Sequence, residues 1–211
     1  MYGLDQISEI VDEVVNRVKQ KTRSFEIEAS GRHIHLCRED IDALFGKKGY
    51  PLTKVKSLSQ PGQFVCKERI TIAGPKGIFR NVVILGPERA ASQVEVSMTD
   101  ARELGINVPV RESGHIEGTP GIVLINGKRT IKLDKGLIVA KRHVHMTPED
   151  ATQKQVKNGQ IVRVKTNTSR PLVFDDVVVR VSPKFATYMH IDYDEANSCG
   201  LNKGNQGFII E

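Results

Sequence analysis

The 211-residue chain contains no tryptophan, few other aromatic residues and only three cysteines. Scarce aromatic side chains disfavour binding of single-stranded nucleic acid, which depends on stacking platforms. The number of cysteines is odd and no C-x-x-C pair occurs, so neither a disulfide framework nor a cysteine-rich zinc site is expected. The three residues are Cys37, Cys66 and Cys199. There is no apolar run of the roughly 18–20 residues that cross a membrane, and no secretory signal. We therefore expect a soluble cytoplasmic protein that binds neither nucleic acid nor membrane.

Strong clustering of positive charge is also absent, although the formal net charge is +6. Lys and Arg are dispersed, with no run of five, which favours small anionic ligands over a polynucleotide. No Walker motif, G-x-G-x-x-G or G-x-S-x-G occurs. The common nucleotide-binding and serine-hydrolase motifs are therefore excluded.

The chain does contain one amphipathic segment followed by many short strand-like runs. Residues 4–20 place Val, Ile and Leu at helical spacing, which predicts a helix that packs on its own domain or docks in a partner's groove. From residue 24 on, short Val/Ile-rich runs bounded by turn residues predict a mainly β protein built as barrels or sandwiches. Four short helices are expected, at 38–46, 98–105, 147–155 and 193–200, the third with Thr147 as N-cap and Pro148 in its first turn.

Two internal repeats occur in the same order along the chain. An Arg-His-x-His-x-x-x-Glu-Asp pattern begins at Arg32 and again at Arg142, and residues 93–105 align with 188–200. In the second alignment Glu95 falls opposite His190. Such duplication predicts two related half-structures packed about a pseudo-two-fold axis.

The repeats carry metal-ligand chemistry. Residues i and i+2 of a strand face the same side, so each H-x-H pair can grip one divalent ion such as Zn²⁺. Glu95 and His190 add a third ligand to each half, which is enough for two metals. Alternatively, the histidines lie in the core and Glu95 pairs with a nearby base. Cys37 could be a ligand or nucleophile, but Thr147 stands at its repeat position, so a small buried side chain is expected. His115 has no repeat partner and is read as a loop residue.

Gly/Pro turns close to basic residues predict an anion site. GPKG (74–77), GPER (86–89), SQPGQF (59–64) and GTPG (118–121) can expose backbone N–H groups. Arg89 ends one of these turns, six residues before Glu95, and could hold phosphate beside the metals. The alternative is that these are ordinary hairpin turns.

Several strings resemble one family closely: RHIHL, SLSQPGQF, GPERAASQVEVSMTDARELGI, SGHIEGTPGI, GLIVAKRHVHMTPEDA and VVVRVSPKFATYMHIDYDEAN. They are similar to the PduL-type phosphotransacylases (phosphate propanoyltransferases), in order, from about residue 24 to 200. The resemblance implies two small β-barrels capped by short helices. One would combine residues 22–31 with 141–211, and the other would span 32–140, after an N-terminal helix at 1–21 that is similar to an encapsulation peptide.

The resemblance also implies which residues form the site. The family's dinuclear zinc centre carries over onto His33, His35 and Glu95 for one ion and His143, His145 and His190 for the other, with Glu95 bridging. Arg89 would bind phosphate, and Arg89 and Glu95 would be catalytic. Coenzyme A contacts carry over to Glu28, Ala29, Ser30, Lys76 and Asn197. The chain departs from the pattern at Gly31, where Asn is expected, and at Val83, where a basic residue is expected and Arg80 could substitute.

The reaction implied is the interconversion of propanoyl-CoA, acetyl-CoA or a similar short acyl-CoA plus phosphate with acyl phosphate plus CoA. The resemblance further implies a role in propanediol degradation inside a bacterial microcompartment, with shell or lumen proteins contacting residues 4–20, and a homodimer is expected. One alternative is a dizinc hydrolase of phosphoesters or thioesters. Another is a scaffold component that uses metal only for folding.

Overall fold

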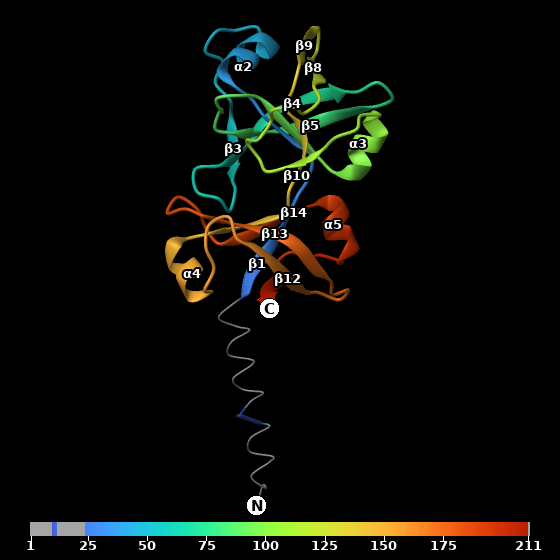
Figure 1. Ribbon diagram of the computed structural model, residues 1–211. Helices are drawn as coiled ribbons and strands as arrows, with labels where there is room; N and C mark the ends of the chain where they lie inside the picture. Colours follow the sequence, from blue (N-terminus) through green and yellow to red (C-terminus); the bar gives the residue numbers. More distant parts are fainter. Residues whose placement is uncertain (1–9, 12–23, 211) are drawn as a thin grey trace, which may run out of the picture. The chain divides into compact units, whose positions relative to one another are not determined.

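The computed structural model describes residues 10–11 and 24–210 (Figure 1). Of the helix predicted over 4–20, only Ile10 and Val11 lie within the described residues, and both side chains are about half exposed. The described chain divides into two compact units. Unit 1 contains residues 24–28, 143–190 and 198–210, and unit 2 contains residues 29–142 and 191–197. The mainly β prediction is confirmed.

Unit 1 is built on a closed barrel with the strand order β1-β14-β11-β13-β12-β15. In β12 the odd positions are exposed, whereas Val162, Val164 and Thr166 are buried, as the two-residue period of a strand requires. The strands are β1 (Ser24–Ser30), β11 (His143–Met146), β12 (Ile161–Asn167), β13 (Val173–Val181), β14 (Tyr188–Asp192) and β15 (Gln206–Ile210).

Unit 2 contains a nine-stranded sheet that curls into a half-barrel rather than closing. Its order is β7-β10-β6-β2-β5-β4-β8-β9, and β3 pairs with β4 outside this path. Its core is aliphatic, with Ile34, Ile72 and Leu124 fully buried. The strands are β2 (His33–His35), β3 (Lys54–Ser57), β4 (Phe64–Ala73), β5 (Ile78–Gly86), β6 (Gln93–Val96), β7 (Val110–Arg111), β8 (Ile122–Asn126), β9 (Arg129–Leu133) and β10 (Leu137–Ala140).

All four predicted short helices are present. They are α2 (Arg38–Phe45), α3 (Met98–Leu104), α4 (Pro148–Gln153) and α5 (Tyr193–Ser198). Thr147 caps α4 by accepting a hydrogen bond from the Asp150 amide, with Pro148 in the first turn, as predicted. Ser97 and Asp100 form a reciprocal capping box on α3. None of the helices in the described part of the chain is long and apolar enough to cross a membrane.

The sequence repeat corresponds to a repeated strand arrangement. In unit 2, β2 lies between β5, which is parallel, and β6, which is antiparallel. In unit 1, β11 lies in the same way between β13 and β14. The positive φ of Asn81 on β5 recurs 95 residues later at Asp176 on β13. Each H-x-H motif is therefore a short central strand flanked by one parallel and one antiparallel neighbour.

Candidate metal and phosphate site

Two histidines and one glutamate meet in unit 2 because β2 pairs with β6. The antiparallel register places His33 opposite Glu95 and His35 opposite Gln93. His33 and His35 share one face of their strand, as their spacing predicted. All three candidate ligands are buried, with 6% of His33, 3% of His35 and 8% of Glu95 exposed.

The spacing of these three side chains suits a metal ion. Their ligand atoms all lie within 4.8 Å of one another, and no other group of the described residues meets this criterion. His33 Nε2 is 3.4 Å from Glu95 Oε2, and His35 Nε2 is 3.8 Å from Glu95 Oε1. Two atoms each about 2.1 Å from a tetrahedral zinc lie about 3.4 Å apart. The remaining nitrogen of His33, Nδ1, is 2.8 Å from the Gly31 carbonyl, which accepts its hydrogen bond when Nε2 faces the ion.

Glu95 and the two histidines have mutually dependent protonation states. Burial alone would raise the pKa of Glu95, but His33 and His35 hold this pKa well below its usual value. Burial alone would lower the pKa of His33, but the Glu95 carboxylate outweighs it and the pKa is raised. The pKa of His35 lies well below its usual value because of burial and the positive charges of His33 and Arg89. The site thus combines a buried carboxylate with a neutral imidazole, a donor set that divalent zinc accepts.

Gln93 and Ser113 complete the polar shell, and sequence reasoning missed both. Gln93 Nε2 donates to Glu95 Oε1 at 2.6 Å, and Ser113 Oγ donates to the same oxygen at 2.9 Å. Gln93 could have been found, because it lies two residues before Glu95 and so shares its strand face. Ser113 lies in the loop after β7, and no spacing rule connects it with Glu95.

The phosphate candidate Arg89 lies beside this group. Its Nη1 donates to Ser113 Oγ at 3.0 Å, and its backbone N–H donates to the Leu36 carbonyl at 2.9 Å. Arg89 and His35 line one pocket of about 220 Å³, together with the Pro61–Gly62–Gln63 turn and with Gly86 and Pro87. Two of the Gly/Pro turns singled out in the sequence therefore border the same hollow. Its size and its guanidinium suit a small oxyanion.

The second histidine group forms in unit 1. His143 is the register partner of His190 across β11 and β14. The ring centroids are 4.6 Å apart for His143 and His145, 5.3 Å for His143 and His190, and 5.1 Å for His145 and His190. Three imidazoles on one tetrahedral zinc would have centroids roughly 5 Å apart. His145 Nδ1 is buried and has no hydrogen-bond partner among the described residues. These observations fit a three-histidine metal site, although its ligand atoms converge less than those of the first group.

The arginine of each motif pairs with an acid at the equivalent helical position. Arg32 donates two hydrogen bonds to Asp100, at 3.1 and 2.6 Å. Arg142 lies 3.1 Å from Glu195, which stands 95 residues after Asp100. Burial raises the pKa of Glu195 to about 7, although its hydrogen bond with Asp192 opposes the rise. Each arginine thereby pairs with an acid in the first turn of the helix that follows Glu95 or His190.

The residues proposed for coenzyme A contact lie on several elements. Glu28, Ala29 and Ser30 form the end of β1, and Glu28 Oε2 is 3.9 Å from His190 Nδ1. Lys76 is exposed in the β4–β5 turn, and Asn197 is exposed on α5. Cys37 is only half-buried, whereas a buried side chain was expected. It is the N-cap residue of α2, and its thiol donates to Asp40 at 3.2 Å.

Both departures from the family pattern have a visible structural context. A Cβ atom placed on Gly31 would lie 2.9 Å from the Tyr193 ring, so Tyr193 occupies the space that a side chain there would need. Val83 is the register partner of His33 on β5. Arg80, three residues earlier on the same strand, is exposed.

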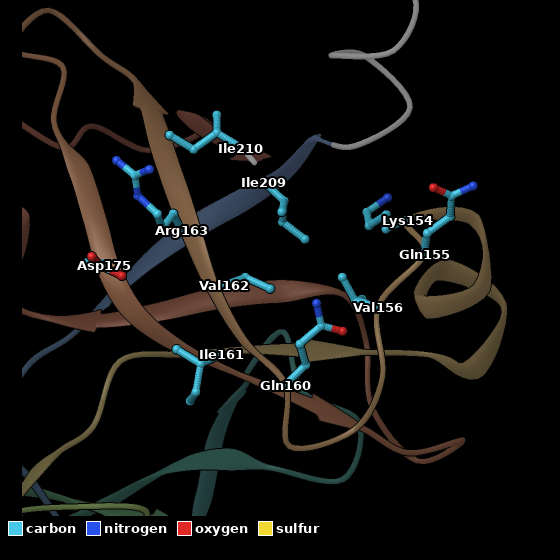
Figure 2. A pocket seen from close by; sticks show the side chains of 10 residues that line it. All are labelled: Lys154, Gln155, Val156, Gln160, Ile161, Val162, Arg163, Asp175, Ile209 and Ile210. Atoms are coloured by element: carbon cyan, nitrogen blue, oxygen red, sulfur yellow. The ribbon is translucent and has the colours of Figure 1, made fainter.

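A larger hollow of about 400 Å³ lies in unit 1, between β12, β15 and the segment after α4 (Figure 2). Apolar side chains such as Val162 and Ile209 line it together with Lys154 and Arg163. None of the candidate ligand, phosphate or coenzyme A residues is among its lining residues. The smaller hollow beside His35 and Arg89 is therefore the one that concerns the site.

Comparison with known proteins agrees with this arrangement. The sequence profile of the phosphate propanoyltransferase family matches residues 26–202. A phosphate propanoyltransferase of Enterococcus faecalis is 69% identical over 212 residues, covering 100% of both chains. The one from Listeria monocytogenes is 62% identical over 97% of this chain and 95% of its own. The phosphate propanoyltransferase of Citrobacter freundii is 48% identical over 93% of this chain and 92% of its own. The chain belongs to the phosphate propanoyltransferase family of acyltransferases.

Proposed function

We propose that the protein interconverts a short-chain acyl-CoA, such as propanoyl-CoA or acetyl-CoA, plus phosphate with acyl phosphate plus CoA. The family and its relatives support phosphate acyltransferase activity. The observation that carries the proposal is the buried His33, His35 and Glu95 group beside an arginine-lined pocket. A metal site next to an arginine-lined pocket would place phosphate beside a Lewis acid, which suits a reaction with phosphate as co-substrate.

The proposal includes two zinc ions. His33, His35 and Glu95 would hold one ion, and His143, His145 and His190 the other. When bound, zinc supplies Lewis-acid polarisation of a phosphate or carbonyl oxygen. A bridging position for Glu95 stays a prediction. The ligand spacing in the first group and the buried free Nδ1 of His145 support this assignment.

The protein's own residues would bind and orient the substrates. Arg89 would hold phosphate by paired N–H donors in the 220 Å³ hollow that it lines with His35. Glu28, Ala29, Ser30, Lys76 and Asn197 would contact coenzyme A. Holding phosphate and thioester together supplies much of the rate by orientation.

Direct transfer is the proposed course of the reaction. A phosphate oxygen attacks the thioester carbonyl carbon, a C–O bond forms, the C–S bond breaks, and CoA leaves as the thiolate. An acyl-enzyme on Cys37 is disfavoured, because burial raises the pKa of this thiol and it is hydrogen-bonded to Asp40. Its repeat partner is Thr147, so the two halves share no nucleophile.

Three further features belong to the same proposal. Residues 4–20 would direct the enzyme into a bacterial microcompartment by contacting shell or lumen proteins, in a pathway of propanediol degradation. The protein would act as a homodimer. The exposed apolar side chains of Ile10 and Val11 support the first of these, because they leave part of the predicted apolar stripe open to a partner.

The test is release of free CoA thiol from acetyl-, propanoyl- and butanoyl-CoA, with and without phosphate. We expect release that requires phosphate and is lost in Arg89→Ala. Release without phosphate would instead identify a dizinc thioester hydrolase. No release from any of the three substrates by the zinc-loaded protein would leave the scaffold alternative.

A further inference from the structure

We propose that Ser113 is a positioning residue that couples the phosphate-binding arginine to the metal-binding glutamate. This inference rests on the proposed function, because it concerns the roles assigned there to Arg89 and Glu95. Ser113 Oγ lies 3.0 Å from Arg89 Nη1, 2.9 Å from Gln93 Nε2 and 2.9 Å from Glu95 Oε1. One hydroxyl thus links the arginine proposed to bind phosphate with the glutamate proposed to bind metal.

The direction of these hydrogen bonds follows from the chemistry of the groups. A guanidinium and an amide nitrogen can only donate, so the serine oxygen accepts from Arg89 and from Gln93. The ionised Glu95 can only accept, so the single hydroxyl proton points to it. The hydroxyl has one proton and two lone pairs, and all three are used. Its orientation is therefore fixed.

Gln93, which lies on the same strand as Glu95, holds the loop that carries Ser113. The Gly114 backbone N–H donates to Gln93 Oε1 at 2.8 Å, while the Nε2 atom of Gln93 donates to both Ser113 and Glu95. Gly114 has a φ of 100°, a conformation that glycine adopts readily and that turns the chain at this point. Gln93 thus orients the loop, and the loop presents the serine.

The consequence is that Glu95 Oε1 is committed to two donors while Oε2 faces His33. The carboxylate cannot rotate without breaking both hydrogen bonds, so Oε2, the oxygen that faces His33, is preset for an ion. On the other side, Arg89 donates from Nη1 to Ser113 and lines the pocket together with His35. Removing the serine hydroxyl should therefore loosen phosphate binding and metal binding together.

The experiment compares the full-length wild type with Ser113→Ala, Ser113→Thr and the control Ser169→Ala, which changes an exposed serine in unit 1. Three quantities are measured: the KM values for phosphate and for acyl-CoA, and zinc affinity by competition with a chromogenic chelator. We expect Ser113→Ala to raise the KM for phosphate about tenfold, because a hydrogen bond to a charged group is lost. It should also weaken zinc binding by roughly tenfold, as loss of a group that orients a metal ligand does. The KM for acyl-CoA should change less than about twofold.

Ser113→Thr keeps the hydroxyl and should restore both affinities to within about threefold of wild type. The inference is overturned if Ser113→Ala leaves phosphate KM and zinc affinity unchanged, or if it shifts the two substrate KM values equally. It is also overturned if Ser113→Thr behaves like Ser113→Ala. If the wild type shows no phosphate-dependent reaction, the proposed function fails, whereas the zinc competition still decides whether Ser113 supports Glu95.

Discussion

The two histidine groups use the same strand arrangement but differ in the third ligand and in its surroundings. In unit 2, Glu95 brings a carboxylate that keeps the pKa of His33 raised and its own pKa low. In unit 1, the third position is His190, and Glu28 Oε2 lies 3.9 Å from its Nδ1. Burial, together with His143 and His190, lowers the pKa of His145 to about 2. The first group therefore contains its own buried ion pair, whereas the second consists of three imidazoles, of which His145 is uncharged at neutral pH.

Among the described residues, the first group is also the one whose candidate ligand atoms converge. Its carboxylate is held by Gln93 and Ser113, so the group has a shell that survives without an ion. The His145 ring packs instead against Phe185, at a centroid distance of 4.1 Å, and its Nδ1 has no partner within the described chain. The duplicated frame therefore carries two different groups, one with a hydrogen-bonded carboxylate and one made of histidines alone.

Removing one histidine from each group tests whether both sites are needed, and it has the largest expected effect. His35→Ala and His145→Ala should each lose about one equivalent of zinc and lower kcat on the order of a thousandfold, because a metal contributes several kcal/mol to such a reaction. Metal analysis and the phosphate-dependent thiol assay measure this. Full activity in either variant would show that its group has no catalytic role. The control is His115→Ala, which changes an exposed loop histidine.

Replacing Glu95, the residue that distinguishes the first histidine group from the second, sharpens the comparison. Glu95→His gives the first group the all-imidazole composition of the second, and it also removes the acceptor of Ser113 and Gln93. We expect zinc to remain bound while kcat falls about a hundredfold, as when one preorganised polar group is lost from an active site. A variant as active as wild type would mean that the carboxylate is not essential. Glu117→His, at an exposed glutamate, is the matched control.

Glu195, the acid that pairs with Arg142, offers a test that depends on pH. Burial raises the folded-state pKa of Glu195 to about 7, above its unfolded value of about 4.5. The folded protein therefore binds more protons than the unfolded chain in this window, and stability is lost as the pH rises through it. Glu195→Gln removes the titration, so its stability relative to wild type should increase by roughly 1–3 kcal/mol between pH 4.5 and 7.5. Urea unfolding at several pH values measures the difference. A difference that is constant with pH would contradict the shifted pKa.

Much of the candidate site could be predicted from the sequence because strand geometry determines it. The i, i+2 spacing placed His33 and His35 on one face, and the repeat alignment selected Glu95 and His190 as the opposing residues. The four short helices carry local signals, such as the Thr147–Pro148 start of α4, and they were predicted for that reason.

What could not be predicted depends on contacts between distant segments. Ser113 reaches Glu95 only because the loop after β7 folds over β6, and nothing in its neighbouring residues encodes that path. The predicted mainly β fold is confirmed, but alternation within a strand does not say whether the two edge strands of a sheet meet, so how far the unit 2 sheet curls needed the structure. The partial exposure of Cys37 follows from its place at the start of α2, between strand and helix.

The smallest expected effect concerns the residue before each Arg-His-x-His motif. This residue is Gly31 in the first repeat and Lys141 in the second. Gly31→Asn introduces the side chain that the family pattern implies, and its Cβ would come within 2.9 Å of the Tyr193 ring. Because Tyr193 is about half exposed and can turn aside, we expect a loss of only about 1 kcal/mol, the lower end of overpacking costs. That loss corresponds to a decrease in Tm of about 2–4 °C. The double variant Gly31→Asn with Tyr193→Ala should recover it. If the decrease persists without the tyrosine ring, the ring is not what keeps this position a glycine.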